Sequence, residues 1–273
     1  MFACSVSLGA QNPQLPANDL ARRVIENEIR AEEQDKSHWM VRVETRKPDS
    51  GSEVDEVIQT PKGELQLPIL INGHPPTQAE EEKAEAHARQ LINDANAAQK
   101  SRKEKSEDFN RSKRMLKMLP EAFIYSYGAR QGDRIELNFR PNPNFRTHGF
   151  EEDVFHAMDG KLWVDEKQNR LAEINGHLSH GVKFLGGLLG HLDKGGSFDV
   201  KQEPVAAGYW ELTMLNVHMT GKALFFKTIG EQQEYYRSEF KRVPDDLSLV
   251  QAEEMLKKEV ALQRRRSAEK QGF

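Results

Sequence analysis

The stretch 160–229 constrains the fold most, because turn-forming residues break it into short runs. Gly, Asn and Asp separate runs that are rich in β-branched and aromatic residues, a pattern typical of sequential antiparallel strands. The runs predict five strands, over residues 160–166, 169–178, 196–204, 208–219 and 222–229. Tight reversals at 167–169 and 220–221 predict that strands adjacent in sequence are also neighbours in the sheet.

Both faces of these strands are partly apolar. Along 208–219, two apolar sets alternate: Trp210, Leu212 and Met214 on one face, and Tyr209, Leu215, Val217 and Met219 on the other. An antiparallel sheet with one face in water would alternate apolar and polar residues instead. One face can pack against helices, so the other needs a second sheet, a helix or an apolar cavity. A curved sheet with an apolar interior meets this need.

Length and composition limit the class of function. The 273 residues can bury a substantial core, as one large domain or two small ones. A hydrophobic content of 37% beside 30% charged residues favours long solvated helices around a compact sheet. The net charge of −4 offers no electrostatic argument for nucleic acid as a partner. No run approaches the roughly 20 apolar residues of a transmembrane span. The single cysteine, Cys4, excludes an internal disulfide.

Residues 1–11 resemble the end of a secretory signal peptide. A short apolar stretch ends in Leu8, Gly9 and Ala10 before Gln11, although no basic region precedes it. A truncated signal peptide predicts a periplasmic or otherwise exported protein. The alternative is an ordinary flexible N-terminus of a cytosolic protein. Both interpretations leave open whether Cys4 belongs to the mature chain.

The rest of the chain alternates between helical and extended patterns. Helices are predicted over 16–36, 77–119, 151–158 and 247–268; two of them begin at capping boxes, Thr77–Glu80 and Ser248–Gln251. Extended segments are predicted at 38–45, in hairpins 54–60/64–71 and 122–129/134–140, and as a last edge strand at 235–243. The mixed charges of 100–108 predict a solvated helix face rather than a nucleic-acid site.

This order of elements resembles the LolA-like fold of periplasmic lipoprotein-sorting and lipid-binding proteins. The best local match is GKLWVD at 160–165 followed by NRLAEING at 169–176, which is similar to a strand pair of that family. The amphipathic segment 19–28 and the hairpin around 59–64 also fit. The resemblance covers about residues 17–243 and implies an α+β fold. In that fold a curved antiparallel sheet forms an unclosed β-barrel, with helices packed on or in one side. The helical insertion 77–119 and the C-terminal helix 247–268 depart from the family core.

The resemblance implies a non-catalytic binding or carrier protein without a cofactor. Its ligand would be a lipid or the acyl chains of a lipoprotein, held in the concave face of the sheet. Each buried methylene would contribute about 0.8 kcal/mol. The candidate ligand contacts are Trp163, Phe184, Leu185, Leu188, Leu189, Trp210, Leu212, Met214 and Phe225. The same side chains could instead be plain core. The glycine-rich segment 184–190 is either a lid or membrane-touching loop, or a hairpin with a glycine turn.

Two other classes of function compete with a carrier. A metal-dependent enzyme would need His177, His180 and His191, but residues three apart on a strand point to opposite faces. The chain also lacks a Gly-x-Ser-x-Gly elbow and a phosphate-binding loop. An envelope scaffold or assembly factor would use the charged helices 77–119 and 247–268 to bind a protein partner.

Overall fold

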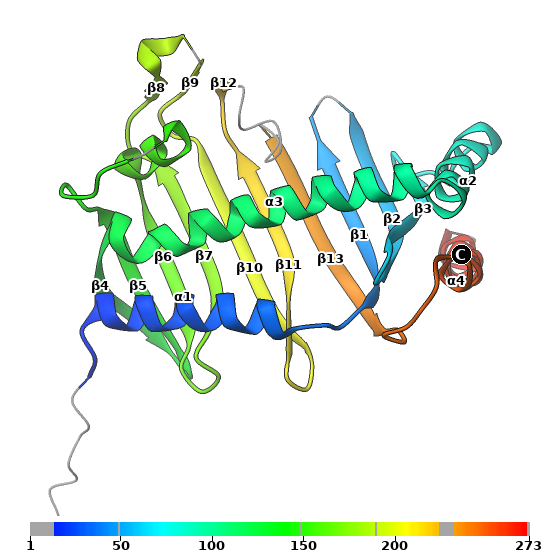
Figure 1. Ribbon diagram of the computed structural model, residues 1–273, viewed down its shortest axis with the longest axis horizontal. Coiled ribbons are helices and arrows are strands. Elements are labelled where there is room, and N and C mark those ends of the chain that lie inside the picture. Colours follow the sequence, from blue (N-terminus) through cyan, green and yellow to red (C-terminus); the bar gives the residue numbers. More distant parts are fainter. Residues whose placement is uncertain (1–13, 49, 148, 189, 224–231, 272–273) are drawn as a thin grey trace, which may run out of the picture.

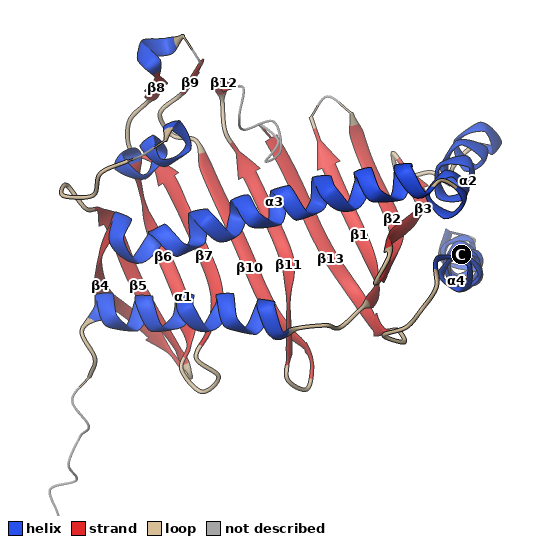
Figure 2. Cartoon of the chain, in the orientation of Figure 1, coloured by secondary structure: helices blue, strands red, loops and turns tan. Residues whose placement is uncertain are grey.

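The fold is known from a computed structural model that describes residues 14–48, 50–147, 149–188, 190–223 and 232–271. Its centre is a ten-stranded antiparallel sheet that does not close on itself (Figures 1 and 2). The strand order is β3-β2-β1-β13-β11-β10-β7-β6-β5-β4. The predicted α+β class with an unclosed antiparallel sheet is therefore confirmed.

The elements have the following bounds. The large sheet contains β1 (Trp39–Lys47), β2 (Gly51–Thr60), β3 (Gly63–Ile71), β4 (Phe123–Gln131), β5 (Arg134–Pro141), β6 (Met158–Asp165), β7 (Arg170–Leu178), β10 (Ser197–Ala206), β11 (Tyr209–His218) and β13 (Gln232–Arg242). A small sheet contains β8 (Val182–Phe184), β9 (Gly190–Leu192) and β12 (Gly221–Ala223). The helices are α1 (Ala17–Gln34), α2 (Gln78–Asn93), α3 (Ala95–Ala122), α4 (Leu249–Gln271), and the 3₁₀ turns η1 (Phe150–Ala157) and η2 (Leu185–Gly187).

Two predictions of strand placement are wrong. The strand predicted at the sheet edge, β13, pairs with β1 on one side and β11 on the other, so it joins the N-terminal meander to the rest. β12 does not continue the large sheet, because it pairs with β9 in the small one. The rest of the predicted strand 222–229 lies outside the described residues. The glycine-rich segment forms the β8–β9 hairpin, the second of its two interpretations.

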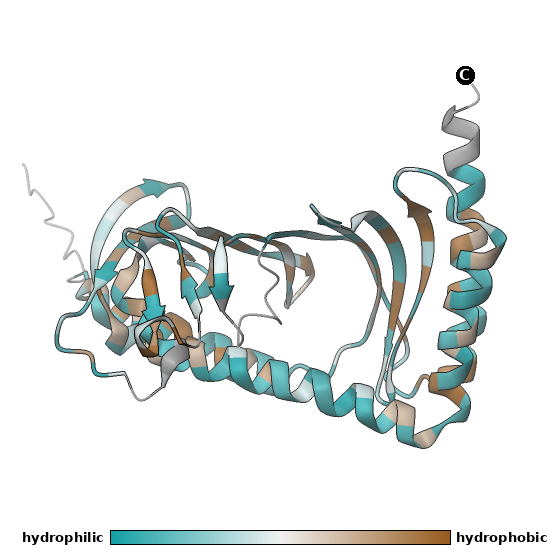
Figure 3. Cartoon of the chain, turned by 90° about the horizontal axis from the view of Figure 1, so that it is seen from above, coloured by the Kyte–Doolittle hydropathy of each residue, from teal (hydrophilic) through white to brown (hydrophobic). Residues whose placement is uncertain are grey.

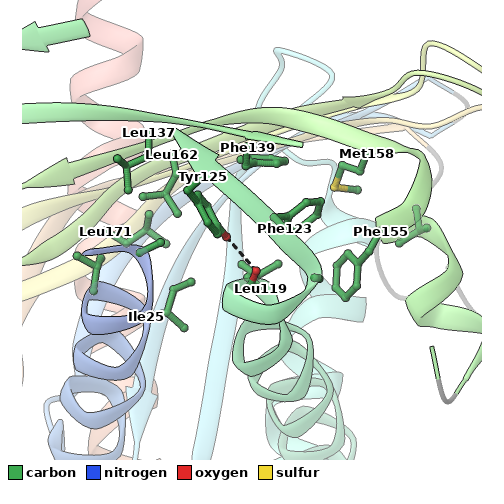
Figure 4. Close-up of a cluster of buried hydrophobic side chains, with 14 of the residues drawn as sticks. Ile25, Leu119, Phe123, Tyr125, Leu137, Phe139, Phe155, Met158, Leu162 and Leu171 are labelled. Atoms are coloured by element: carbon green, nitrogen blue, oxygen red, sulfur yellow. Dashed lines mark hydrogen bonds between the residues drawn. The ribbon is translucent and has the colours of Figure 1, made fainter. Parts of the chain in front are cut away.

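The main core lies on one face of the sheet, under α1 and the C-terminal part of α3 (Figure 4). α1 contributes Val24 and Ile25, at the spacing that its sequence predicts. Aromatic rings fill the space below the end of α3; those of Phe123 and Phe139 lie 4.6 Å apart. The hydroxyl of Tyr125 donates to the carbonyl of Leu119 at 3.1 Å, and burial raises the pKa of this tyrosine.

A second core forms on the opposite face, at the other end of the sheet. There α4 packs on β2 and β3. Figure 3 shows α3 and α4 on opposite sides of these strands. The helix begins at the predicted capping box, in which the Ser248 N–H donates to Gln251 Oε1 at 3.1 Å. The sheet therefore needs apolar side chains on both faces, but at different ends.

Two strand glycines, Gly160 and Gly176, sit opposite each other in β6 and β7 and let aromatic rings approach the sheet. A Cβ atom on Gly160 would lie 2.0 Å from the carbonyl oxygen of Asn175 and 2.8 Å from the Phe139 ring. On Gly176 it would lie 2.7 Å from the ring of Phe198. These positions are thus required to be glycine by close packing rather than by a turn.

We expect Gly160→Ala to destabilise the fold by about 1–3 kcal/mol, because the added methyl group overpacks the sheet. Thermal unfolding followed by circular dichroism measures this change. Gly149→Ala is the matched control, since its Cβ would lie 3.9 Å from Glu152 Oε1, an ordinary van der Waals distance. Equal melting temperatures for the two variants would contradict the packing argument.

Glu56 is fully buried in β2, on the side covered by α4. Neither carboxylate oxygen has a hydrogen-bond partner among the described residues. Burial raises the pKa of Glu56 from 4.5 to about 7, and so do Glu259 and Glu239, while Lys241 and Arg42 oppose the shift. Below about pH 4.5, the carboxyl group of Glu56 is protonated in both the folded and the unfolded chain. Between there and about pH 7, the folded state loses stability, because it must bury the ionised form.

Glu56→Gln should therefore stabilise the protein by about 2–3 kcal/mol at pH 8 and change little at pH 4. Urea unfolding at both pH values measures the difference. Glu254→Gln, at an exposed position of α4, serves as the control and should have a small effect at either pH. A Glu56→Gln benefit of the same size at pH 4 and pH 8 would rule out the titration as its cause.

Candidate functional site

A continuous row of apolar side chains crosses the face of the sheet that α1 and α3 cover. Cross-strand partners share a face, so the row can be followed from strand to strand. It consists of Leu137, Leu162, Ile174, Val200, Leu215 and Tyr235. The first two are fully buried in the main core, whereas the other four are only half-buried. The helices therefore bury two residues of the row completely and leave the other four partly open.

The helix α3 crosses the sheet above the open part of the row and makes its main contacts near its two ends. Its 28 residues span about 42 Å. Its C-terminal end packs on α1, β4 and η1, and its N-terminal part reaches the β2–β3 hairpin. There Arg102 donates to the carbonyl of Lys62 at 2.9 Å, and Lys105 pairs with Glu64. Residues 102–110, which include Arg102 and Lys105, are all exposed. α3 is thus fixed at its two ends above a partly uncovered sheet (Figures 1 and 3).

A cavity of about 960 Å³ opens where α1 ends. Its walls are the last turns of α1, the connection 34–37, the β10–β11 hairpin, Leu116 of α3 and the end of β13. Aromatic and aliphatic groups line it beside charged ones: Tyr209, Trp210 and Leu212 on β11, and Arg170, Arg237 and Arg242 on β7 and β13. This mixed lining suits a ligand that has both polar and apolar parts.

Glu28 and Arg170 form a buried ion pair in this cavity wall, with 5% and 14% of their side chains exposed. Arg170 Nε donates to Glu28 Oε1 at 2.7 Å and Nη2 donates to Oε2 at 3.0 Å. The backbone N–H of Leu171 donates to the same carboxylate at 2.6 Å. The guanidinium of Arg170 also lies 5.5 Å from the Trp210 ring centroid. This bidentate pair ties α1 to the edge of β7 and fixes one side of the cavity.

Two further arginines hold the β13 side. Arg237 donates to Glu211 at 3.1 Å, and only a tenth of its side chain is exposed. Burial raises the pKa of Glu211, although Arg237 opposes the shift. Arg242 lies 4.8 Å from the Tyr209 ring centroid and donates to Asp245 at 2.7 Å. These arginines are held by carboxylates and rings, so they form a rigid polar wall rather than a strongly cationic pocket.

The polar wall adjoins the apolar row. Arg237 and Tyr235 are two residues apart on β13, so both side chains point to the same face. Burial raises the pKa of the Tyr235 hydroxyl, while the nearby Arg237 opposes the shift. A ligand in the cavity would therefore touch charged groups at one end and the uncovered part of the row at the other.

The predicted ligand contacts fall into four groups. Trp210 and Leu212 line the cavity. Trp163 directly follows Leu162, and Met214 directly precedes Leu215, so both lie on the face opposite to the row. The prediction that they line the concave face is wrong. Phe184 is buried in the main core rather than in the cavity. Leu185 and Leu188 are exposed at the tip of the small sheet, while Leu189 and Phe225 lie outside the described residues.

Sequence reasoning missed most of the cavity wall. It placed Trp210, Leu212 and Met214 on one face, but the β10–β11 register shifts between Leu212 and Met214 and interrupts the alternation. None of the six residues of the row was predicted as a ligand contact, because only strand pairing places residues such as Val200 and Tyr235 beside Leu215. The charged residues gave no signal, since an isolated arginine on a strand looks like an ordinary exposed residue.

The histidines do not assemble into a metal site. His177 lies 3.1 Å from Asp159, and His191 lies 3.6 Å from Asp193. His180 contacts the hydroxyl of Ser179. Across the described part of the chain, no three His, Cys, Asp or Glu side chains are grouped so that they could hold a metal ion. None of the described helices combines the length and the apolar composition that a membrane crossing requires.

Comparison with known proteins adds no assignment. The chain matches no family model, and no curated protein shows significant sequence similarity to it.

Glu28→Ala should destabilise the fold by about 3 kcal/mol, because it leaves the guanidinium of Arg170 and the N–H of Leu171 without their buried partner. Urea unfolding followed by circular dichroism measures the cost. Glu26→Ala, at an exposed position of the same helix, should change stability by less than about 0.5 kcal/mol. Similar costs for both variants would show that the Glu28–Arg170 pair does not anchor α1.

Proposed function

We propose that this chain is a non-catalytic binding or carrier protein for an amphipathic ligand such as a lipid or a lipoprotein acyl chain. The observation that carries this proposal is the partly covered apolar row beneath α3. A row of this kind costs free energy when it faces water, at about 25 cal/mol per Å² of apolar surface. A ligand chain lying along the row would remove that surface from water.

The cavity supplies the polar half of such a site. An acyl chain would lie across Val200, Leu215 and Tyr235, and its polar head would reach the wall formed by Arg237 and Arg242. Since the row continues into the filled core at Leu162, the chain could cross only the uncovered strands. This geometry favours a single chain or a short pair over a bulky lipid.

The same geometry supports the resemblance to LolA-like proteins. In that comparison the ten-stranded sheet is an unclosed β-barrel, and α1 and α3 are the helices on its concave side. We extend the proposal to an exported, periplasmic location, where carriers of this type work.

An envelope scaffold that binds a protein partner is the second candidate. It is favoured by residues 102–110 of α3, all of which are exposed. The apolar side of α4 is less suited to this role, because it is buried against β2 and β3. Chemical cross-links from Lys103 to another protein of the cell envelope would favour the scaffold over the carrier.

Leu215→Gln should weaken the uptake of a fluorescent fatty acid by about tenfold or more, because it places an amide in the middle of the row. Met214→Gln is the matched control, since it makes a similar change on the adjacent residue of the opposite face and should leave uptake intact. Fluorescence titration in detergent-free buffer measures both affinities, and circular dichroism confirms folding. The carrier proposal fails if the wild-type protein takes up no fatty acid, or if both variants bind as it does.

A further inference from the structure

The small sheet projects from one end of the large sheet and has two different faces (Figure 1). On its inner face, Val182, Phe184 and Leu192 are buried in the main core. On its outer face, Lys183, His191 and Lys222 are paired across the three strands and are exposed. The sheet is thus anchored by apolar groups and presents a basic row to solvent.

Two leucines stand out at the tip of this sheet. Leu185 is 53% exposed and Leu188 is 87% exposed, the largest value among the exposed large apolar residues. They belong to the same turn around η2, where Leu185, Gly186 and Gly187 have positive φ angles of 48°, 65° and 102°. The backbone therefore turns sharply and holds both side chains away from the core. Leucine side chains that face solvent in a turn do not stabilise the fold. The exposed pair Leu185 and Leu188 therefore favours contact with an apolar partner.

The charges beside the tip narrow the class of partner. Lys183, Lys194 and Lys222 are exposed cations, and the acidic Asp193 lies 3.6 Å from His191. An acidic surface with an apolar interior is complementary to this arrangement. A bilayer that contains anionic lipid has both properties, since basic side chains bind its head groups while apolar ones enter the acyl region.

The position of the tip connects it to the proposed ligand site. β8 follows β7, β9 precedes β10, and β12 follows β11. These three strands of the large sheet carry Ile174, Val200 and Leu215, half-buried members of the apolar row. We propose that the β8–β9 tip docks the protein on an anionic membrane surface, with Leu185 and Leu188 inserted and Lys183 and Lys222 on the head groups. This rests on the proposed carrier function, because docking there brings the open strands to a source of lipid.

Vesicle flotation tests the docking directly. The probes are vesicles of phosphatidylcholine alone and vesicles in which about a third of the lipid is phosphatidylglycerol. We expect the wild-type protein to float with the anionic vesicles, and less so at high salt, since salt screens the lysines. The double variant Leu185→Ser/Leu188→Ser should bind at least tenfold more weakly. Val250→Ser, at a 55% exposed apolar position of α4, should bind as wild type does.

Fatty-acid uptake from solution separates this inference from the carrier proposal. The tip variant should retain wild-type uptake, because Leu185 and Leu188 do not line the cavity. Loss of both vesicle binding and uptake in a folded tip variant would contradict a separate docking role. The inference is overturned if the wild-type protein does not bind anionic vesicles, or if the tip variant binds them equally well. It is also overturned if the tip mediates self-association, measured by light scattering, in place of membrane binding.

Discussion

The structure depends on how far its helices bury the concave face of the sheet, because this face is apolar across more strands than the helices cover. α1 and the end of α3 bury Leu137 and Leu162 completely, so the β4–β7 end is an ordinary packed core. Beyond β7 the row of apolar side chains continues, but the central part of α3 above it carries exposed, mostly charged residues. Phe109 is the one large apolar residue of the stretch 102–110, so this stretch is a poor cover for an apolar surface. The concave face is therefore fully covered at the β4–β7 end of the sheet and lacks an apolar cover beyond β7.

Side chains of α1 and α4 contact the backbone at the two edges of the sheet. At β4, the side chain of Asn18 accepts a hydrogen bond from the N–H of Tyr125 at 3.0 Å and donates to the carbonyl of Phe123 at 3.3 Å. At β3, Pro68 has no N–H to offer, and Arg264 of α4 donates to its carbonyl at 2.7 Å. Blocked edges of this kind prevent pairing with another chain. The half-buried part of the row lies on a face of the sheet and not at either edge.

Local signals in the sequence predicted local structure well. The capping boxes at Thr77 and Ser248 mark the true starts of α2 and α4, and the hairpins lie close to their predicted bounds. The predictions that failed concern strands distant in sequence. Nothing in residues 232–242 indicates that this strand pairs with β1 and β11, because the pairing depends on which strand edges remain free after the other strands pair. The cavity was missed for the same reason, since its arginines come from separate strands and acquire a role only through register.

The buried ion pairs show why a carrier of this form would keep its polar wall rigid. Glu28 and Arg170 satisfy each other and the backbone of Leu171, so the wall does not collapse into the space beside it. A charge left without a partner there would either bind water tightly or pull a neighbouring side chain across the opening. Because the arginines are already neutralised, binding would not have to remove strongly held counterions. Affinity for a ligand would then come chiefly from the apolar row, while the paired charges set the orientation of its polar end.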